Sequence, residues 1–154
     1  MPKVIFNAQK TDGGLAFNGK IIFNDVTLNV GNGMNSDGFV VPIAGHYRLS
    51  FSAIGALGKY LINTAVSVGK NGAYEFSILD SSKGNTSDGN SISHNWIWKL
   101  NKGDRVSLFV SRRSYLTATS NSPLNFNGQL VLVDTSPKFR IRHHLPYNSS
   151  FPFD

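Results

Sequence analysis

The residue types that usually perform catalysis are few in this chain, and their spacing matches no catalytic pattern. Its only glutamate is Glu75, and its four histidines are His46, His94, His143 and His144. The sequence lacks the G-x-S-x-G, H-E-x-x-H and phosphate-loop patterns, whose spacing brings a nucleophile, a zinc ion or a phosphate to its partners. An acid–base pair would have to be assembled from scattered aspartates. We predict that the protein is not an enzyme and requires no cofactor.

Metal-ion ligands are limited to oxygen and imidazole groups, because the chain has no cysteine and therefore no disulfide or thiolate site. His143 and His144 are adjacent, so an extended chain would point them to opposite faces. The polar segment 81–90 follows Asp80 and contains Asp88, and oxygen-rich loops of this kind suit calcium. Asp80 and Asp88 are therefore candidate calcium ligands, with an ordinary solvated turn as the alternative.

Basic residues outnumber acidic ones, 15 against 9, and the formal net charge is +6. Such a surface favours anionic partners, among them acidic glycans, lipid headgroups and nucleic acid. Arginine binds carboxylate, sulfate and phosphate through paired hydrogen bonds. The candidate anion-binding residues are Arg112, Arg113, Lys138, Arg140 and Arg142. In an extended tail the last three would share one face, although a merely solubilising surface is the alternative. Aromatic residues are not interleaved with these cations on an exposed platform, which disfavours single-stranded nucleic acid.

Secretion has weak support from the sequence itself. Two sequons, Asn85-Thr-Ser and Asn148-Ser-Ser, are candidate glycosylation sites, but an Asn- and Ser-rich chain contains such triplets by chance. No apolar stretch reaches the roughly 18 residues that a membrane-spanning helix needs. The first residues lack the apolar core of a secretory signal, so we expect that a signal was removed or that none existed.

The elements that position these residues are predicted to be β-strands, because apolar and polar residues alternate along most of the chain. The alternating segments are 45–54, 61–68, 91–100, 105–110 and 126–133. The residues predicted to face the core include Tyr47, Leu49, Phe51, Trp96, Trp98, Leu108 and Phe126. No window shows the 3.6-residue period of a helix. Many short strands separated by turn residues predict an all-β sandwich or jelly roll.

A turn signal and the end of the alternating pattern indicate how the chain is organised. Asn71-Gly72 follows an apolar run and suits a tight hairpin turn, which requires positive φ. His94 shares the apolar face of its segment, so we expect a histidine of the core or of an interface. The alternation stops after Val133. We therefore predict one domain over residues 1–134 and a basic, proline-containing tail over residues 135–154.

Six short patterns follow one another along about residues 4–133. They are Val4-x-Phe6-x-Ala8; Phe23 with Asn29; Phe39 followed by Gly45-x-Tyr47-x-Leu49-x-Phe51; Val66-Ser-Val68-Gly-Lys70-Asn71-Gly72; Leu100-x-x-Gly103-Asp104-x-Val106-x-Leu108; and Phe126-x-Gly128-x-Leu130. In this order they resemble the globular head (C1q-type) domain of the complement C1q and tumour-necrosis-factor superfamily. Met34, Leu49 and Ser107 stand where that family usually has other residues.

The resemblance implies a ten-stranded antiparallel jelly roll of two sheets that assembles as a secreted homotrimer. It also implies calcium near the apex of the head, for which Asp80 and Asp88 are the best positional matches. We therefore predict a lectin-like pattern-recognition module of innate immunity that binds anionic glycan, lipopolysaccharide or a protein partner.

A structural jelly-roll assembly protein, such as a small viral capsid subunit, is the alternative. Its usual length, basic charge and all-β pattern fit this chain as well. Particle size separates the two hypotheses, because a recognition module forms a small oligomer and a capsid subunit forms a shell.

Overall fold

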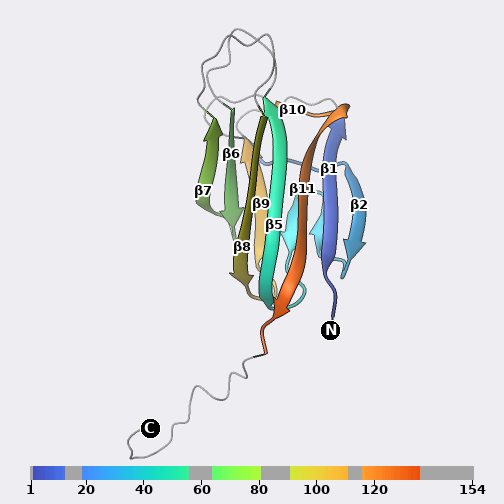
Figure 1. The fold of residues 1–154 in the computed structure, drawn as a ribbon, viewed down its shortest axis with the longest axis vertical. Helices are drawn as coiled ribbons and strands as arrows, with labels where there is room; N and C mark the ends of the chain where they lie inside the picture. The colour runs from blue at the N-terminus through green and yellow to red at the C-terminus, as the bar shows by residue number, and fades with distance from the viewer. Residues whose placement is uncertain (1, 13–18, 56–63, 81–90, 111–115, 136–154) are drawn as a thin grey trace, which may run out of the picture.

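Strands and turns make up the part of the chain that the structure, a computed structural model, describes (Figure 1). That part comprises residues 2–12, 19–55, 64–80, 91–110 and 116–135. The strands are β1 (Ile5–Asp12), β2 (Asp25–Val30), β3 (Met34–Asn35), β4 (Gly38–Val40), β5 (Gly45–Gly55), β6 (Thr64–Lys70), β7 (Ala73–Asp80), β8 (Ser91–Leu100), β9 (Arg105–Val110), β10 (Leu116–Thr117) and β11 (Thr119–Val133). None of these ranges contains a helix long and apolar enough to cross a membrane.

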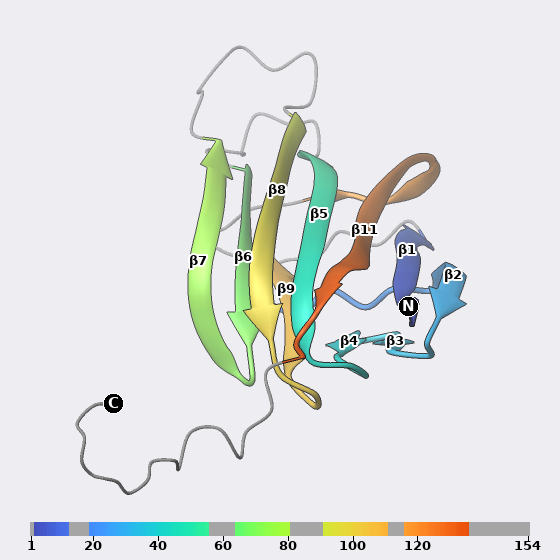
Figure 2. The same ribbon diagram turned by 60° about the horizontal axis from the view of Figure 1, so that its bottom comes forward.

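Two antiparallel sheets pack face to face. In the six-stranded sheet, β5 pairs with β8 on one side and β11 on the other, β11 pairs with β1, and β1 pairs with β2. The five-stranded sheet has the order β3-β4-β9-β6-β7. Figure 2 shows β7 and β8 at one side of the sandwich and β1 and β2 at the other. The predicted antiparallel jelly roll is confirmed.

The structure has eleven described strands where ten were predicted. Two of the eleven, β3 and β10, have only two residues each, and in β10 Leu116 pairs with Gly55 at the end of β5. The predicted strand 61–68 is β6, which begins at Thr64; residues 61–63 lie outside the described ranges.

The apolar faces of the two sheets form one continuous core. The predicted core residues that are each no more than 2% exposed are Tyr47, Leu49, Phe51, Leu108 and Phe126. Trp96 and Trp98 also pack against this core but stay partly exposed. The reason is their position on β8, an edge strand of the six-stranded sheet beyond which no described strand pairs.

Aromatic rings fill the centre of the core. Phe6 stacks on Phe39 with ring centroids 4.5 Å apart and meets Phe126 edge-on at 5.0 Å. Burying each such ring stabilises the fold by about 1.5–3 kcal/mol. Gly128 lies opposite Phe6 on β11, where a Cβ atom would come within 2.5 Å of the Phe6 ring. The close approach of ring and backbone explains why a glycine stands in this strand.

Two hairpin turns at one end of the sandwich are joined by side-chain hydrogen bonds. Asn71 and Gly72 have φ values of 54° and 86° and connect β6 to β7, as predicted. The Asn71 side chain accepts a hydrogen bond from the Arg105 N–H (2.8 Å) and donates one to Asp104 Oδ1 (3.0 Å). The other oxygen of Asp104 accepts from the Asn101 N–H at 2.8 Å. The β6–β7 turn is thereby fixed to the β8–β9 turn.

Strand β11 is longer than the predicted segment 126–133, since it begins at Thr119. The added part contains Pro123, which has no N–H for a ladder. Between Leu124, opposite Lys10, and Thr119, opposite Asp12, the register with β1 shifts. The proline is tolerated because it lies at this irregularity.

Candidate functional site

Most residues predicted to bind ligands lie outside the described ranges. These are Arg112, Arg113, Lys138, Arg140 and Arg142 among the cations, Asp88 at the calcium candidate, and Asn85 and Asn148 of the sequons. Asp80 ends β7, where it pairs with Thr64 of β6. Within the described ranges, no three His, Asp or Glu side chains gather as a metal-ion ligand set. The anion and calcium sites therefore remain predictions.

The outer face of the six-stranded sheet carries uncharged hydrogen-bonding side chains in rows. Alternation along β5 points Ser50 and Ser52 away from the buried Tyr47, Leu49 and Phe51. Cross-strand register then sets Asn127 and Asn95 beside Ser50, and Asn125 and Ser93 beside Ser52. Side chains directly opposite on neighbouring strands lie about 4.5–5.5 Å apart at Cβ. The face therefore presents two adjacent polar rows across β11, β5 and β8.

Hydrogen bonds fix some of these side chains and leave others open. Ser50 Oγ donates to Asn127 Oδ1 at 2.6 Å, so these two side chains of the first row bond to each other. In the second row, Gln9 Nε2 donates to Asn125 Oδ1 at 2.8 Å, which holds the Asn125 amide in place. The neighbouring Ser52 has no side-chain hydrogen bond among the described residues.

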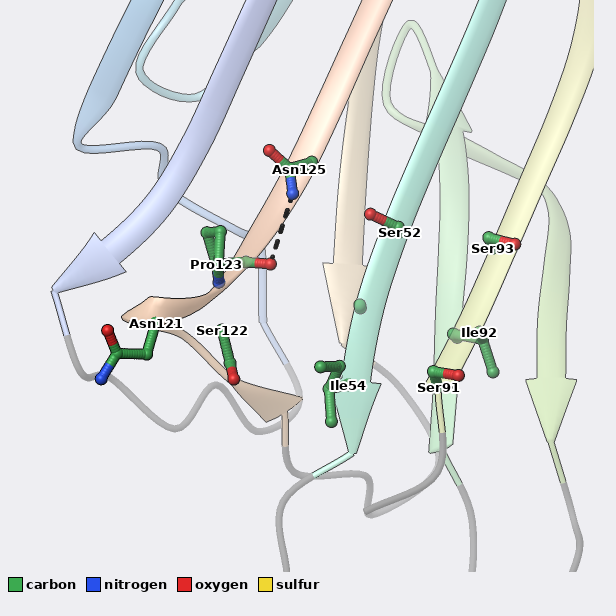
Figure 3. A pocket seen from close by; sticks show the side chains of 10 residues that line it. Ser52, Ile54, Ser91, Ile92, Ser93, Asn121, Ser122, Pro123 and Asn125 are labelled. Atoms are coloured by element: carbon green, nitrogen blue, oxygen red, sulfur yellow. Dashed lines mark hydrogen bonds between the residues drawn. The ribbon is translucent and has the colours of Figure 1, made fainter. Parts of the chain in front are cut away.

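A cavity of about 420 Å³ opens at the end of this second row (Figure 3). Its polar lining consists of Ser52, Ser91, Ser93, Asn121, Ser122 and Asn125. Its remaining lining is Ala53, Ile54, Ile92 and Pro123. No charged residue lines it, and its volume falls within the range of small-molecule sites. Figure 3 shows that Asn125, Ser52 and Ser93 come from three neighbouring strands.

The opposite end of the same face is cationic. Arg48 and Lys99 are exposed, and His46 stands directly opposite Lys99 on the adjacent strand. None of these three side chains has an ion-pair partner among the described residues. His46 Nδ1 is shielded from solvent and has no hydrogen-bond partner there. This end of the sheet therefore favours negative charge.

A partly exposed aromatic cluster occupies the edge where β7 and β8 meet. His94 stacks on Trp96 with centroids 5.5 Å apart, and Phe76 of β7 meets both Trp96 (5.4 Å) and Trp98 (5.8 Å) edge-on. The Lys70 ammonium lies 5.2 Å from the Trp98 ring centre. Trp96 Nε1 is buried without a hydrogen-bond partner among the described residues. His94 is thus part of a partly exposed aromatic edge, whereas a histidine of the core or of an interface was expected.

A second apolar surface lies on β2, at the far side of the six-stranded sheet. Val26, Leu28 and Val30 are 37%, 43% and 41% exposed. Strand β2 is an edge strand, and these three partly exposed residues form the β2 stripe. Its register with β1 shifts, so that Leu28 lies opposite Asn7 and Val26 lies opposite the buried Ala8. This β2 stripe and the aromatic edge are separated by the whole width of the sheet (Figure 2).

Sequence reasoning did not find the cavity. The polar half of the alternation in residues 45–54 was available as a clue, because it placed Ser50 and Ser52 together on the face opposite the core. The partners of Ser52 come from strands more than 40 and 70 residues away along the chain, at Ser93 and Asn125. Their meeting depends on the strand register, which alternation within one strand does not specify.

Comparisons with known proteins agree with this architecture. The family model of the C1q domain matches residues 5–131. The globular domain of zebrafish complement 1qA protein has 17% sequence identity and a TM-score of 0.69, covering 85% of this chain and 99% of that one. The crystal structure of murine APRIL at pH 8.0 has 13% identity and a TM-score of 0.63, covering 84% and 99%. A search of curated proteins finds no significant match. At these identities the solved structures show the shared fold alone, whereas the family match spans most of the chain, which therefore belongs to the C1q-domain family.

Proposed function

We propose that the protein is a non-catalytic recognition module that acts outside the cell as a homotrimer and binds anionic surface polymers. The observation that carries this proposal is the C1q-domain match over residues 5–131, because domains of this family are generally non-enzymatic and typically extracellular. The polymers would be sulfated or sialylated glycans or bacterial lipopolysaccharide. Purified protein that hydrolysed a generic ester, glycoside or phosphate, and lost this activity in His94→Ala, would contradict the non-catalytic role.

Two exposed apolar surfaces support a cyclic oligomer. The aromatic edge on β7 and β8 and the β2 stripe lie on opposite sides of the sandwich. If the aromatic edge of one protomer covers the β2 stripe of the next, an open series leaves one uncovered surface at each of its two ends, and a ring covers both. Covering them stabilises the assembly by about 25 cal/mol for each Å² of apolar surface buried. Three protomers is the number that the C1q and tumour-necrosis-factor fold suggests.

Net charge supports an anionic ligand. The formal charge is +6, and the described outer face adds the unpaired Arg48 and Lys99 to the predicted cations of the tail. An exposed ion pair contributes at most about 1 kcal/mol and is screened by salt. Three copies that bridge one polymer raise the affinity by about 10²–10⁴ without new contacts. Binding should therefore fall steeply with salt and depend strongly on ligand valency.

Retention on a heparin column tests the predicted tail site. We expect the variant in which Lys138, Arg140 and Arg142 are all changed to Gln to elute at much lower salt than the parent while keeping its oligomeric state. The matched control changes Lys3, Lys20 and Lys102 to Gln, which removes the same charge from other exposed positions. Elution of the tail variant together with the parent would contradict a tail site. Equal weakening of both variants would show that only net charge matters.

Calcium is a further part of the proposal, with Asp80 and Asp88 as ligands. The support is that Asp80 directly precedes the oxygen-rich polar segment 81–90 and Asp88 lies within it. Isothermal titration with calcium chloride should show binding to the parent that is lost when both aspartates are changed to Asn. No heat of binding to the parent would contradict the calcium site.

A further inference from the structure

We propose that the outer face of the five-stranded sheet binds a uronic-acid unit of an acidic glycan, at a site formed by Tyr74, Phe109 and Arg105. The inference rests on the proposed binding of anionic polymers, and it adds a subsite that is separate from the cations of the tail. The three side chains come from β7 and β9, the two strands that flank β6 in this sheet. The site therefore lies within one protomer.

A β-bulge in β7 turns Tyr74 to the outer face of the sheet. Phe76 pairs with the buried Val68 and packs against the core. Strict alternation would point Tyr74, two residues earlier, to the same side as Phe76. The register shifts there, and Tyr74 instead pairs with Gly69 and is 72% exposed. Bulges that redirect a side chain are common next to functional sites. Since the bulge removes the Tyr74 ring from the core, core packing does not account for this tyrosine.

The second ring, Phe109, is held beside Tyr74. Phe109 alternates with the buried Leu108 and Val110, so its ring lies on the outer face. A Cβ atom at Gly69 would come within 2.8 Å of Phe109 Cε1, so the glycine lets this ring settle against β6. Tyr74 meets Phe109 edge-on, with ring centroids 5.1 Å apart. The two rings thus form an aromatic surface before a ligand arrives, and such a surface loses little conformational freedom on binding.

A cation lies on the same face. Arg105 is exposed and shares its side of β9 with Ser107 and Phe109. Ser107 and Tyr74 belong to one cross-strand row, because both pair with the same residue of β6. The Arg105 guanidinium has no ion-pair partner among the described residues. The adjacent Asp104 already accepts hydrogen bonds with both carboxylate oxygens inside the two turns. Arg105 is therefore open to an external anion.

The combination of rings and guanidinium selects the ligand class. The C–H groups on one face of a pyranose ring can pack against aromatic rings, and the Tyr74 hydroxyl can bond to a sugar hydroxyl. The carboxylate of a uronic acid projects from the edge of its ring, where an arginine can hold it through paired hydrogen bonds. A neutral sugar would leave Arg105 unused, and polyphosphate has no ring to stack on Tyr74. A uronic acid uses both features.

The site is separate from the surfaces that we propose join the protomers. The aromatic edge is formed on the other side of β7, where Phe76 meets Trp96 and Trp98 of β8. Tyr74 and Phe109 lie instead on the outer face of the five-stranded sheet. A contact between the aromatic edge and the β2 stripe leaves this face uncovered, so a trimer would present the site three times.

Affinity electrophoresis of the full chain in gels that contain polygalacturonate, dextran or inorganic polyphosphate tests the proposal. We expect polygalacturonate to retard the parent and dextran, which has no charge, to leave it unretarded. Tyr74→Ala should weaken the retardation by polygalacturonate about tenfold, as expected for the loss of one stacked ring. The same variant should keep the parent's retardation by polyphosphate, which offers no ring. Tyr74→Phe should retain most of the binding to polygalacturonate.

Charge variants test the role of Arg105. Arg105→Gln should weaken the retardation by polygalacturonate more than the matched control Lys102→Gln, which removes the same charge from an exposed position in the adjoining turn. Glu75→Gln removes a negative charge next to Tyr74 in the sequence and should strengthen the retardation. Equal effects of Arg105→Gln and Lys102→Gln would contradict a specific contact with Arg105.

Several further outcomes would overturn the inference. Retardation by polygalacturonate that is unchanged in Tyr74→Ala, or that falls equally with polyphosphate, would exclude the aromatic surface. A changed oligomeric state in Tyr74→Ala would show that another protomer covers this face. Retardation by dextran as strong as that by polygalacturonate would exclude uronic acid as the ligand class. If polygalacturonate fails to retard a parent that heparin retains, this inference fails and the proposed function stands; if neither polymer binds, both fail.

Discussion

Tyr47 is a titratable residue whose side chain lies in the core. Its ring is fully buried, and its hydroxyl donates a hydrogen bond to the Ile43 carbonyl oxygen at 2.6 Å. Burial raises the pKa of Tyr47 above the ordinary value of 10.0. An unfolded tyrosine ionises near pH 10, whereas the folded one resists ionisation. Its contribution to stability is therefore fully present below pH 10 and is lost as the pH rises through the higher folded pKa.

The change Tyr47→Phe tests this coupling. We expect a loss of about 1 kcal/mol at neutral pH, because the Ile43 carbonyl loses its partner. We also expect the free energy of unfolding of the variant to fall less than that of the parent between pH 9 and pH 11 (roughly the range around the ordinary pKa). Urea unfolding at each pH gives both quantities. Parallel pH profiles for the two proteins would contradict a raised pKa at Tyr47.

At the scale of elements, the two turns that contain Asn71 and Asp104 depend on a few side-chain hydrogen bonds, so a single substitution there should lower the stability of the fold. Asn71→Ala removes the hydrogen bonds to Arg105 and Asp104 and places alanine at a φ of 54°. We expect a loss of about 2–3 kcal/mol, from about 1 kcal/mol for each hydrogen bond and a further cost for the backbone conformation. Chemical denaturation measures it.

Asn71→Gly separates the two causes, because glycine accepts the positive φ but makes no side-chain hydrogen bond. It should recover part of the lost stability. If Asn71→Ala unfolds at the same urea concentration as the parent, the turns are not coupled through this side chain.

Alternation predicted strands well where one face is buried by the protein itself. Strands β8 and β9 have the predicted bounds, and Tyr47, Leu49 and Phe51 face the core as expected. It failed for the start of β11, because TSNSP in residues 119–123 has neither alternation nor a free N–H at Pro123. The exposed stripe of β2 alternates as clearly as a core strand, so the pattern alone does not say what covers it.

At the scale of the whole molecule, the candidate sites differ in how far they could be predicted. Net charge and the basic tail follow directly from composition, which is why an anionic partner was expected. The uncharged cavity could not be found in this way. Ser52, Ser93 and Asn125 are residue types that are common on surfaces, and only the strand register brings them together.

The β2 stripe provides a means to separate assembly from folding. Leu28 is 43% exposed, so Leu28→Asp should leave the sandwich folded while placing a charge in the surface that we propose another protomer covers. Burial of an unpaired charge is costly, and the variant should therefore dissociate. Far-ultraviolet circular dichroism that matches the parent would show that its fold is intact. A variant that stays assembled would exclude this stripe from the contact between protomers.

Sedimentation equilibrium of the parent at micromolar concentration tests the central claim most directly. A trimeric recognition module predicts a single species of three times the 16.8 kDa chain mass, without added ligand. A species of 16.8 kDa alone would contradict the trimer, and the gain from multivalent binding would disappear with it. Shell-sized particles would contradict the recognition module itself and favour a structural assembly protein.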